Sequence, residues 1–304
     1  MNKNAFNPLA MASDVARSRR QYFARKIGDF IVGLLRLNAP GFFTTEIVQK
    51  IDPVCRIKTQ KEDMRCVGGH GRLLWRANTF YTEEPYTVAW LDTLTELDLL
   101  WDVGANVGLY GIYAAMIAGC KVVSFEPEAM NYAILIRNIV LNNLQDRITA
   151  TNVPLTQKLD LGRLHVGAIT RGGAWNQFSL ESDTTLSKLN PFVQDSPITQ
   201  LQFGVSMDEL VEEYGLDCPT HIKIDVDGNE PEIINGAGRV LENPKLDSIL
   251  IEQERNNTDH DDIERILHEH GFRIVSAAVT GESRPDMNVK DDWVWRNVIW
   301  RRND

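Results

Sequence analysis

Residues 102–111 read Asp-Val-Gly-Ala-Asn-Val-Gly-Leu-Tyr-Gly, and their pattern indicates the class of fold. The apolar run Leu-Asp-Leu-Leu-Trp precedes it, and Ile-Tyr-Ala-Ala-Met-Ile-Ala follows it. The pattern predicts a buried strand that ends at Asp102, a tight turn containing Gly104 and Gly108, and then a helix. A glycine-containing turn between a strand and a helix is typical of nucleotide-binding α/β folds.

From about residue 98 onward, apolar strands alternate with amphipathic helices. This alternation predicts an α/β fold with a mostly parallel sheet and helices on both faces. The expected core strands are 98–103, 121–126, 148–153, 220–225 and 247–252. The expected helices are 108–119, 129–143, 206–214, 230–242 and 259–270. Two last strands, at 272–279 and 293–300, are expected to form an antiparallel edge.

Two segments depart from this alternation. Residues 155–205 carry Gly162, Gly167, Gly172 and Gly173 among short β-like runs, and we interpret them as an insertion with a hairpin. Residues 1–90 are interpreted as an N-terminal extension, and residues 91–304 as the principal domain. In the extension we expect an amphipathic helix at about 20–37, then short β-rich pieces and a helix at 87–95. That first helix either docks on its own core, which we favour, or lies on a membrane or a partner; its apolar face makes a homodimer plausible.

Composition restricts the classes of partner. The chain has 304 residues and a formal net charge of −10, which disfavours binding to nucleic acid by charge alone. Its four cysteines are scattered without zinc-site spacing, as expected for reduced thiols in a cytoplasmic protein. No stretch is long and apolar enough to predict a transmembrane segment.

The charge at the first strand end indicates which ligand the turn would bind. Gly104, Asn106 and Gly108 give G-x-N-x-G, whereas dinucleotide folds use G-x-G-x-x-G. A carboxylate at Asp102 would repel a diphosphate but suits a ligand with cationic ammonium and sulfonium groups, such as S-adenosylmethionine. We therefore expect the turn, including Ala105, to bind that cofactor. The alternative is a tight strand–helix turn that binds no ligand.

Glu126 and Pro127 close the next strand, about twenty residues after the glycines. An acid at this distance can accept hydrogen bonds from both ribose hydroxyls. The alternative, which is compatible with it, is an acid that caps the following helix. Asn152 and Val153 end the third strand, and their position places them near the adenine.

The candidate catalytic residues lie in residues 223–231, Lys-Ile-Asp-Val-Asp-Gly-Asn-Glu-Pro. A strand would deliver Asp225 to the ligand cleft as a general base or a metal ligand. Lys223 lies on the same strand face and would orient Asp225 through an ion pair. Asp227 and Glu230 are further candidates, although capping by Asp227 or Asn229 and a favourable helix dipole at Glu230 explain them equally well.

A metal site is a second possibility at this strand edge. Asp225, Glu252 and a nearby histidine would supply hard ligands for Mg²⁺ or another divalent cation. A solvated acidic helix start explains residues 259–262 equally well. Trp175, in the insertion, could stack on a sugar ring, but ordinary packing is the favoured interpretation.

With these residues assembled, the chain resembles the FkbM family of S-adenosylmethionine-dependent methyltransferases from about residue 80 to 300. The resemblance rests on residues 84–90, 102–110, 125–127 with Asn138 and Asn142, 206–210 and 223–230. Asp227-Gly228 stands where the family more often has Glu-Gly, and residues 1–79 show no such resemblance.

The resemblance implies a Rossmann-like methyltransferase sheet of seven strands, the last antiparallel, and O-methylation of a hydroxyl on a sugar, glycan or natural product. It places the methionine end of the cofactor at the 102–108 turn, the ribose at Glu126 and the acceptor near Asp225. Two other functions remain open: a catalytically silent cofactor-binding module, and a nicotinamide-dependent oxidoreductase, which the missing third glycine disfavours.

Overall fold

The structure is a computed structural model that describes residues 26–31, 33, 53–167, 170–180, 193, 196, 198–254, 259–280 and 295–303. The chain forms two compact units, Met1–Asp52 and Pro53–Asp304. In the first unit, residues 26–31 and 33 are helical, inside the helix expected at about 20–37. The docking of that helix stays a prediction. The second unit begins well before residue 91, so residues 53–90 belong with the principal domain rather than with a separate extension.

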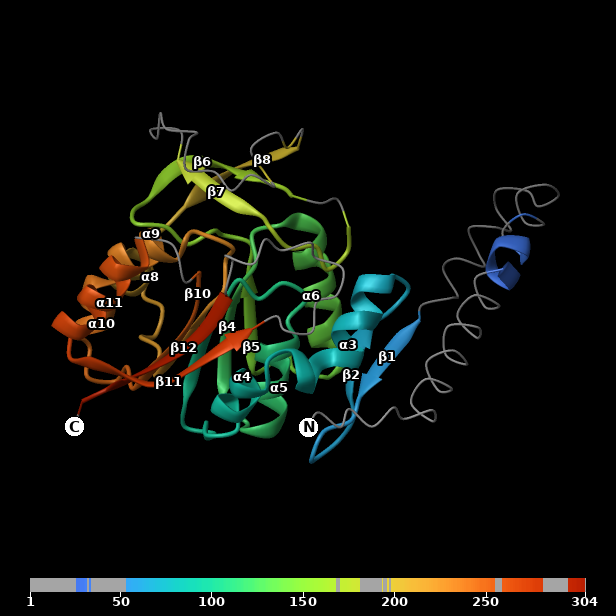
Figure 1. Cartoon of the computed structure of the whole chain (residues 1–304), viewed down its shortest axis with the longest axis horizontal. Helices are drawn as coiled ribbons and strands as arrows, with labels where there is room; N and C mark the ends of the chain where they lie inside the picture. The colour runs from blue at the N-terminus through green and yellow to red at the C-terminus, as the bar shows by residue number, and fades with distance from the viewer. Residues whose placement is uncertain are drawn as a thin grey trace, which may run out of the picture. The chain divides into compact units, whose positions relative to one another are not determined.

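A seven-stranded sheet forms the centre of the second unit, in the order β11-β12-β10-β9-β3-β4-β5 (Figure 1). Its strands are β3 (Leu99–Val103), β4 (Lys121–Phe125), β5 (Ile148–Thr151), β9 (His221–Ile224), β10 (Ser248–Glu254), β11 (Phe272–Thr280) and β12 (Trp295–Arg302). The ladders from β10 through β9, β3 and β4 to β5 are parallel, and β12 runs antiparallel to both of its neighbours. The predicted Rossmann-like sheet with an antiparallel last strand is confirmed.

Helices cover both faces of the sheet. Successive residues of β3 point to opposite sides of the sheet, so they pack into different apolar clusters. Leu100 packs into one buried apolar cluster, and Trp101 and Val103 pack into another. The helices described after residue 100 include α5 (Leu109–Ile117), α6 (Ala129–Leu141), α8 (Met207–Glu212), α9 (Glu230–Asn235), α10 (Gly238–Glu242) and α11 (Asp259–Glu269).

The single helix expected at 230–242 is two helices, α9 and α10, separated at Gly236. A Cβ on Gly236 would lie 2.4 Å from the carbonyl oxygen of Thr156, so the chain approaches the start of the insertion too closely for any side chain. The break is therefore set by a tertiary contact.

Residues 53–91 form a hairpin and two helices that pack against α5 and α6. These elements are β1 (Val54–Ile57), β2 (Met64–Val67), α3 (Gly71–Glu83) and α4 (Pro85–Leu91). The hairpin agrees with the expected β-rich pieces, but α3 was not predicted. Asn138 of α6 fastens the hairpin to the glycine turn, because its side chain accepts from Val67 N at 2.7 Å and donates to Val107 O at 2.7 Å.

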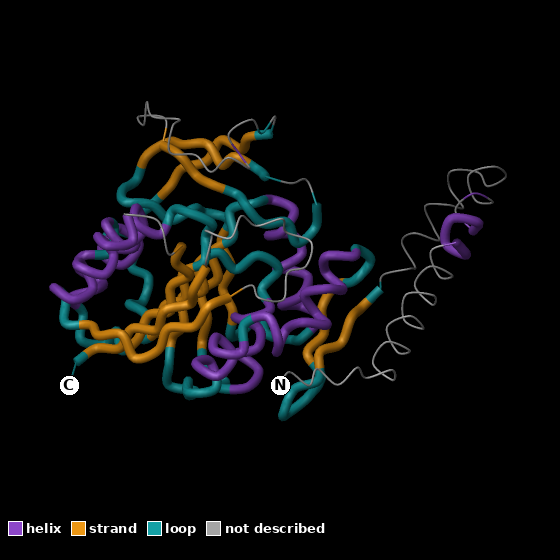
Figure 2. Tube along the Cα trace, viewed as in Figure 1, coloured by secondary structure: helices purple, strands orange, loops and turns teal. Residues whose placement is uncertain are grey.

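The insertion is larger than the predicted hairpin. It forms a separate three-stranded antiparallel sheet, ordered β7-β6-β8, from β6 (Asp160–His165), β7 (Gln177–Leu180) and β8 (Thr199–Gly204). Figure 2 shows this small sheet beside one end of the main sheet. Its own apolar cluster includes Leu164 and Phe178. Within the part of the chain that the structure describes, no helix has both the length and the apolar character needed to cross a bilayer.

Candidate active site

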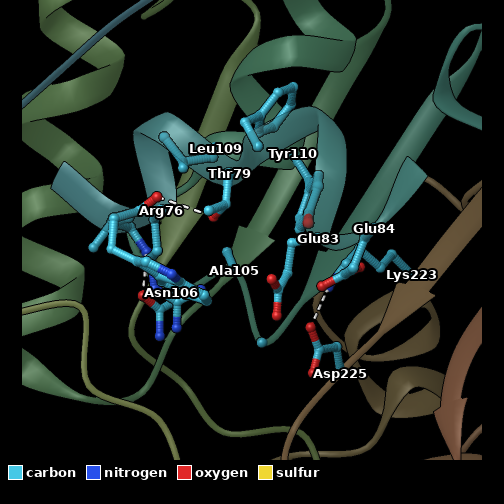
Figure 3. Close-up of a pocket in the computed structure, with 14 residues that line it drawn as sticks. Arg76, Thr79, Glu83, Glu84, Ala105, Asn106, Leu109, Tyr110, Lys223 and Asp225 are labelled. Atoms are coloured by element: carbon cyan, nitrogen blue, oxygen red, sulfur yellow. Dashed lines mark hydrogen bonds and ion pairs between the residues drawn. The ribbon is translucent and has the colours of Figure 1, made fainter. Parts of the chain in front are cut away.

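A cleft lies beyond the carboxyl ends of β3 and β9 (Figure 3), and its empty space, which includes open solvent at the mouth, is about 530 Å³. Three segments line it: α3 with the residue after it, the turn and first residues of α5, and the end of β9. The sequence-predicted residues among the lining side chains and backbone are Gly104, Ala105, Asn106, Lys223 and Asp225. The structure thus brings the two central motifs together.

Gly104 also lines a second cavity, whose empty space, open solvent included, is about 320 Å³. Pro127 and Val153 line this second cavity together with apolar side chains that include Phe125 and Phe178. Two of the residues expected to hold a nucleoside therefore share one apolar site. Asn152, by contrast, is exposed, and its carbonyl oxygen accepts from Gln202 of the insertion at 3.2 Å.

The glycine turn requires its glycines for two physical reasons. Gly104 and Gly108 have φ angles of 79° and 84°, which side chains other than that of glycine rarely allow. A Cβ on Gly104 would lie 1.8 Å from the carbonyl oxygen of Asp225, and one on Gly108 would lie 2.3 Å from Leu135 Cδ1. The turn therefore packs directly on the backbone that carries Asp225.

Asp102 lies beneath the turn and does not line either cavity. Its Oδ2 accepts from Gly111 N at 3.2 Å, and its Oδ1 has no hydrogen-bond partner among the described residues. Burial raises the pKa of this carboxyl. Asp102 is paired in the parallel ladder with Lys223, so the two side chains share a sheet face. This position differs from the expected one, in which the carboxylate points at the ligand.

Glu126 braces the turn from the end of β4. Its Oε2 accepts from Asn106 N at 2.7 Å and its Oε1 accepts from Glu128 N at 2.8 Å. Burial raises the pKa of Glu126 to about 8. The helix cap considered for this residue is instead Glu128, whose side chain accepts from the first amides of α6. Ribose binding by Glu126 stays a prediction.

Lys223 and Asp225 form the expected ion pair, with Lys223 Nζ 2.9 Å from Asp225 Oδ2. Both residues line the cleft, but the Lys223 side chain is 1% exposed and that of Asp225 is 26% exposed, so the carboxylate is the more accessible of the two groups. Burial alone would raise the pKa of Asp225, but the Lys223 ammonium and a hydrogen bond from Glu252 bring that pKa below its ordinary value. The structure thus presents an ionised carboxylate to the cleft at neutral pH.

Lys223 is held charged by its neighbours. Burial would lower the pKa of the Lys223 ammonium, but the carboxyl groups of Asp225, Asp102 and Glu84 raise it overall. The ammonium also lies 5.2 Å from the centre of the Tyr110 ring, a favourable cation–π distance. This buried cation positions Asp225 and sets its charge.

The expected metal site receives no support from the described residues. Asp225 and Glu252 are close enough to share a hydrogen bond. However, within residues 53–167, 170–180, 198–254, 259–280 and the other described positions, no group of three or more histidine, cysteine, aspartate and glutamate side chains could hold an ion.

Three further candidates, Asp227, Asn229 and Glu230, do not line the cleft. Their side chains instead form hydrogen bonds with backbone groups near it. Asp227 Oδ2 accepts from Trp175 N at 2.6 Å, and the Asn229 amide bonds both N and O of Phe178 at 2.8 Å. Glu230 Oε1 accepts from Val226 N at 3.1 Å. Asn229 occupies the N-cap position of α9 without a side-chain capping bond, so the capping interpretation is wrong for it.

The buried Glu230 carboxyl predicts a loss of stability at alkaline pH. Burial raises the pKa of Glu230 from 4.5 to about 8, so the folded state holds the proton more tightly than the unfolded state. Its stabilising contribution is complete below about pH 4.5 and is lost as the pH rises through 8. In the wild type, the free energy of unfolding should decline from acid to alkaline pH. In Glu230→Gln, denaturant unfolding should show a decline that is smaller than that of the wild type by at least about 1 kcal/mol. The exposed Glu213→Gln is the control; a decline as steep as that of the wild type in E230Q contradicts the assignment.

Sequence reasoning missed the wall that α3 contributes. Arg76, Thr79 and Glu83 line the cleft from a segment that shows no motif, and Glu84 lines it from the start of the 84–90 stretch. The available signal was helical spacing, because Leu73, Ala77 and Phe80 are the buried residues of α3, at intervals of four and three.

Comparison with known proteins identifies the family. The family model described as "Methyltransferase FkbM domain" matches residues 102–274, more than half of the chain. This chain belongs to the FkbM methyltransferase family. It is therefore a methyltransferase, and the FkbM match begins at the strand end that carries Asp102 and reaches into β11.

Curated relatives include two methyltransferases of known name. The hexuronic acid methyltransferase AglP of Haloferax volcanii is 26% identical over 200 residues, covering 64% of this chain and 72% of the relative. The 31-O-demethyl-FK506 methyltransferase FkbM of Streptomyces tacrolimicus is 23% identical over 193 residues, covering 59% and 74%. Among solved structures, methyltransferase FkbM from Methylobacillus flagellatus is 17% identical, with a TM-score of 0.43 and coverage of 76% and 55%.

Proposed function

We propose that this enzyme transfers a methyl group from S-adenosylmethionine to a hydroxyl oxygen of a sugar, glycan or small natural product. The observation that carries the proposal is an ionised carboxylate, Asp225, in a cleft whose turn packs on that residue's own backbone. The relatives named above for a hexuronic acid and for a demethylated natural product support this class of acceptor.

The two cavities fit the parts of S-adenosylmethionine. The apolar cavity lined by Pro127 and Val153 suits a planar base. Glu126 joins the two regions, since it bonds Asn106 N in the turn and directly precedes Pro127. Around the cleft, Glu84 provides negative charge for an ammonium group. When bound, the donor supplies an electrophilic methyl group on a positively charged sulfur.

The chain's own residues supply position and a base. A sugar hydroxyl is a weak nucleophile at neutral pH, so its proton must be accepted as the new bond forms. Asp225 accepts that proton, and Lys223 holds the carboxylate ionised and oriented. The walls of the cleft fix the hydroxyl in line, which removes much of the entropic cost of the encounter.

Replacing the buried cation should move the pH dependence of the reaction. In Lys223→Met the burial of Asp225 is no longer opposed by an ammonium, so the pKa of that carboxyl rises. The acid limb of the kcat/KM profile should move to higher pH, with a loss of about tenfold per pH unit of displacement below the new pKa. Activity should recover at alkaline pH, and the exposed Lys121→Met should keep the wild-type profile. A uniform loss at every pH would contradict this role.

The function is tested with the full chain. Calorimetry with S-adenosylmethionine should show binding, and NAD, the control ligand, should not bind. A panel of sugars, uronic acids and hydroxylated natural products is then incubated with methyl-labelled donor, and the product mass should increase by one methyl group. Donor binding without product from any acceptor would favour a silent binding module, and NAD binding alone would overturn the proposal.

A further inference from the structure

Arg76 of α3 is a cation of the cleft wall, and among the described residues its side chain makes a single hydrogen bond. Its Nε donates to Gly172 O at 3.3 Å, and no ion pair of Arg76 occurs among the described residues. A guanidinium has five N–H donors arranged in a plane. The other donors of Arg76 are therefore available to a bound molecule.

The other cation of the cleft is not available in this way. Lys223 is 1% exposed and already paired with Asp225 at 2.9 Å. Figure 3 shows Arg76 and Asn106 on one side of the cleft, and Glu84, Lys223 and Asp225 on the other. The cleft thus has a carboxylate-rich side and an opposite side where the accessible charge is the Arg76 guanidinium.

We infer that Arg76 binds a carboxylate of a molecule held in the cleft. Planar guanidinium donors match a carboxylate in a bidentate pair, which is among the stronger polar contacts in proteins. The inference rests on the proposed function, which offers two sources of this group: the α-carboxylate of the methyl donor and the carboxylate of a uronic-acid acceptor.

The contact with Gly172 does not account for Arg76, because other side chains hold the same loop. Asn131 accepts from Gly172 N at 2.9 Å and donates to Gly173 O at 3.1 Å. Asn106 donates to Gly173 O as well, at 2.6 Å. The loop therefore keeps three shorter bonds when Arg76 is replaced.

The first arm of the test asks whether the donor supplies the carboxylate. The affinities of S-adenosylmethionine and of its decarboxylated analogue are measured by calorimetry for the wild type, Arg76→Gln and Arg76→Lys. If the donor is the source, the wild type should prefer the intact molecule by at least about tenfold, R76Q should lose this preference, and R76K should keep part of it. Arg72→Gln, one turn earlier on α3 and outside the cleft lining, should behave as the wild type.

The second arm asks whether the acceptor supplies it. Binding of D-glucuronate and D-glucose to the protein saturated with S-adenosylhomocysteine is compared in the same variants. A preference of the wild type for glucuronate that R76Q abolishes assigns the site to the acceptor. The inference is overturned if R76Q changes neither preference or if the wild type has neither. A different result would show that the proposed function itself is wrong: the wild type would then bind neither S-adenosylmethionine nor its decarboxylated analogue.

Discussion

Replacing Asp225 with asparagine should lower kcat by about 10²- to 10⁴-fold, the range that a general base contributes. The amide keeps the shape of the side chain but cannot accept the acceptor's proton. Affinity for S-adenosylmethionine should stay within a few-fold of the wild type, because the turn and the apolar cavity remain. Single-turnover rates with labelled donor, together with calorimetry, separate the two effects.

Asparagine is preferable to alanine at this position because Lys223 is buried beside it. Removing the whole side chain would leave an ammonium without a partner, which destabilises a protein by several kcal/mol. Asp247→Asn, at an exposed ion pair with Arg301 at the start of β10, is the matched control. Near wild-type turnover in D225N would exclude Asp225 as the base.

Gly104→Ala should destabilise the enzyme and abolish donor binding together. The left-handed backbone conformation at φ 79° costs a non-glycine residue about 1–2 kcal/mol. The added Cβ would also overlap the carbonyl oxygen of Asp225, at 1.8 Å, so the backbone of β9 or of the turn must move. A fall in melting temperature of roughly 5 °C or more is expected, because 1 kcal/mol corresponds to about 2–4 °C in a domain of this size class.

A glycine in ordinary geometry provides the comparison. Gly238 begins α10, and a Cβ there would meet its nearest neighbour, Asp208 Oδ2, at 3.7 Å. Gly238→Ala should leave the melting temperature and the donor affinity close to wild type. If G104A binds the donor as the wild type does, the turn is not part of the donor site.

The central sheet was predictable because its strands are short runs rich in apolar and β-branched residues, bounded by polar or turn residues. Leu99–Val103 and His221–Ile224 lie within one residue of the predicted limits, and their ends place Gly104 and Asp225 at one edge. The parallel order then follows from the helices between the strands. Local pattern and global packing agree in this region, which is why both motifs were recognised.

The remainder depends on contacts that the sequence does not display. The run Thr-Phe-Tyr-Thr at 79–82 favours a strand by composition, but packing of Phe80 in the core holds it in α3. Asp102 was expected to face the ligand because it ends a strand. The Asp102 side chain instead lies on the sheet face that it shares with Ser124 and Lys223, and there it accepts a hydrogen bond from the backbone of α5.

The dependence of the cleft on α3 limits how the enzyme can be divided. A fragment restricted to the family-matched residues 102–274 would lack one wall of the cavity, including Arg76. It would also lack β12 and most of β11, so β10 would become an unpaired edge of the sheet. Such a fragment is expected to aggregate, and chimeras between family members should therefore exchange everything from β1 to β12 as one piece.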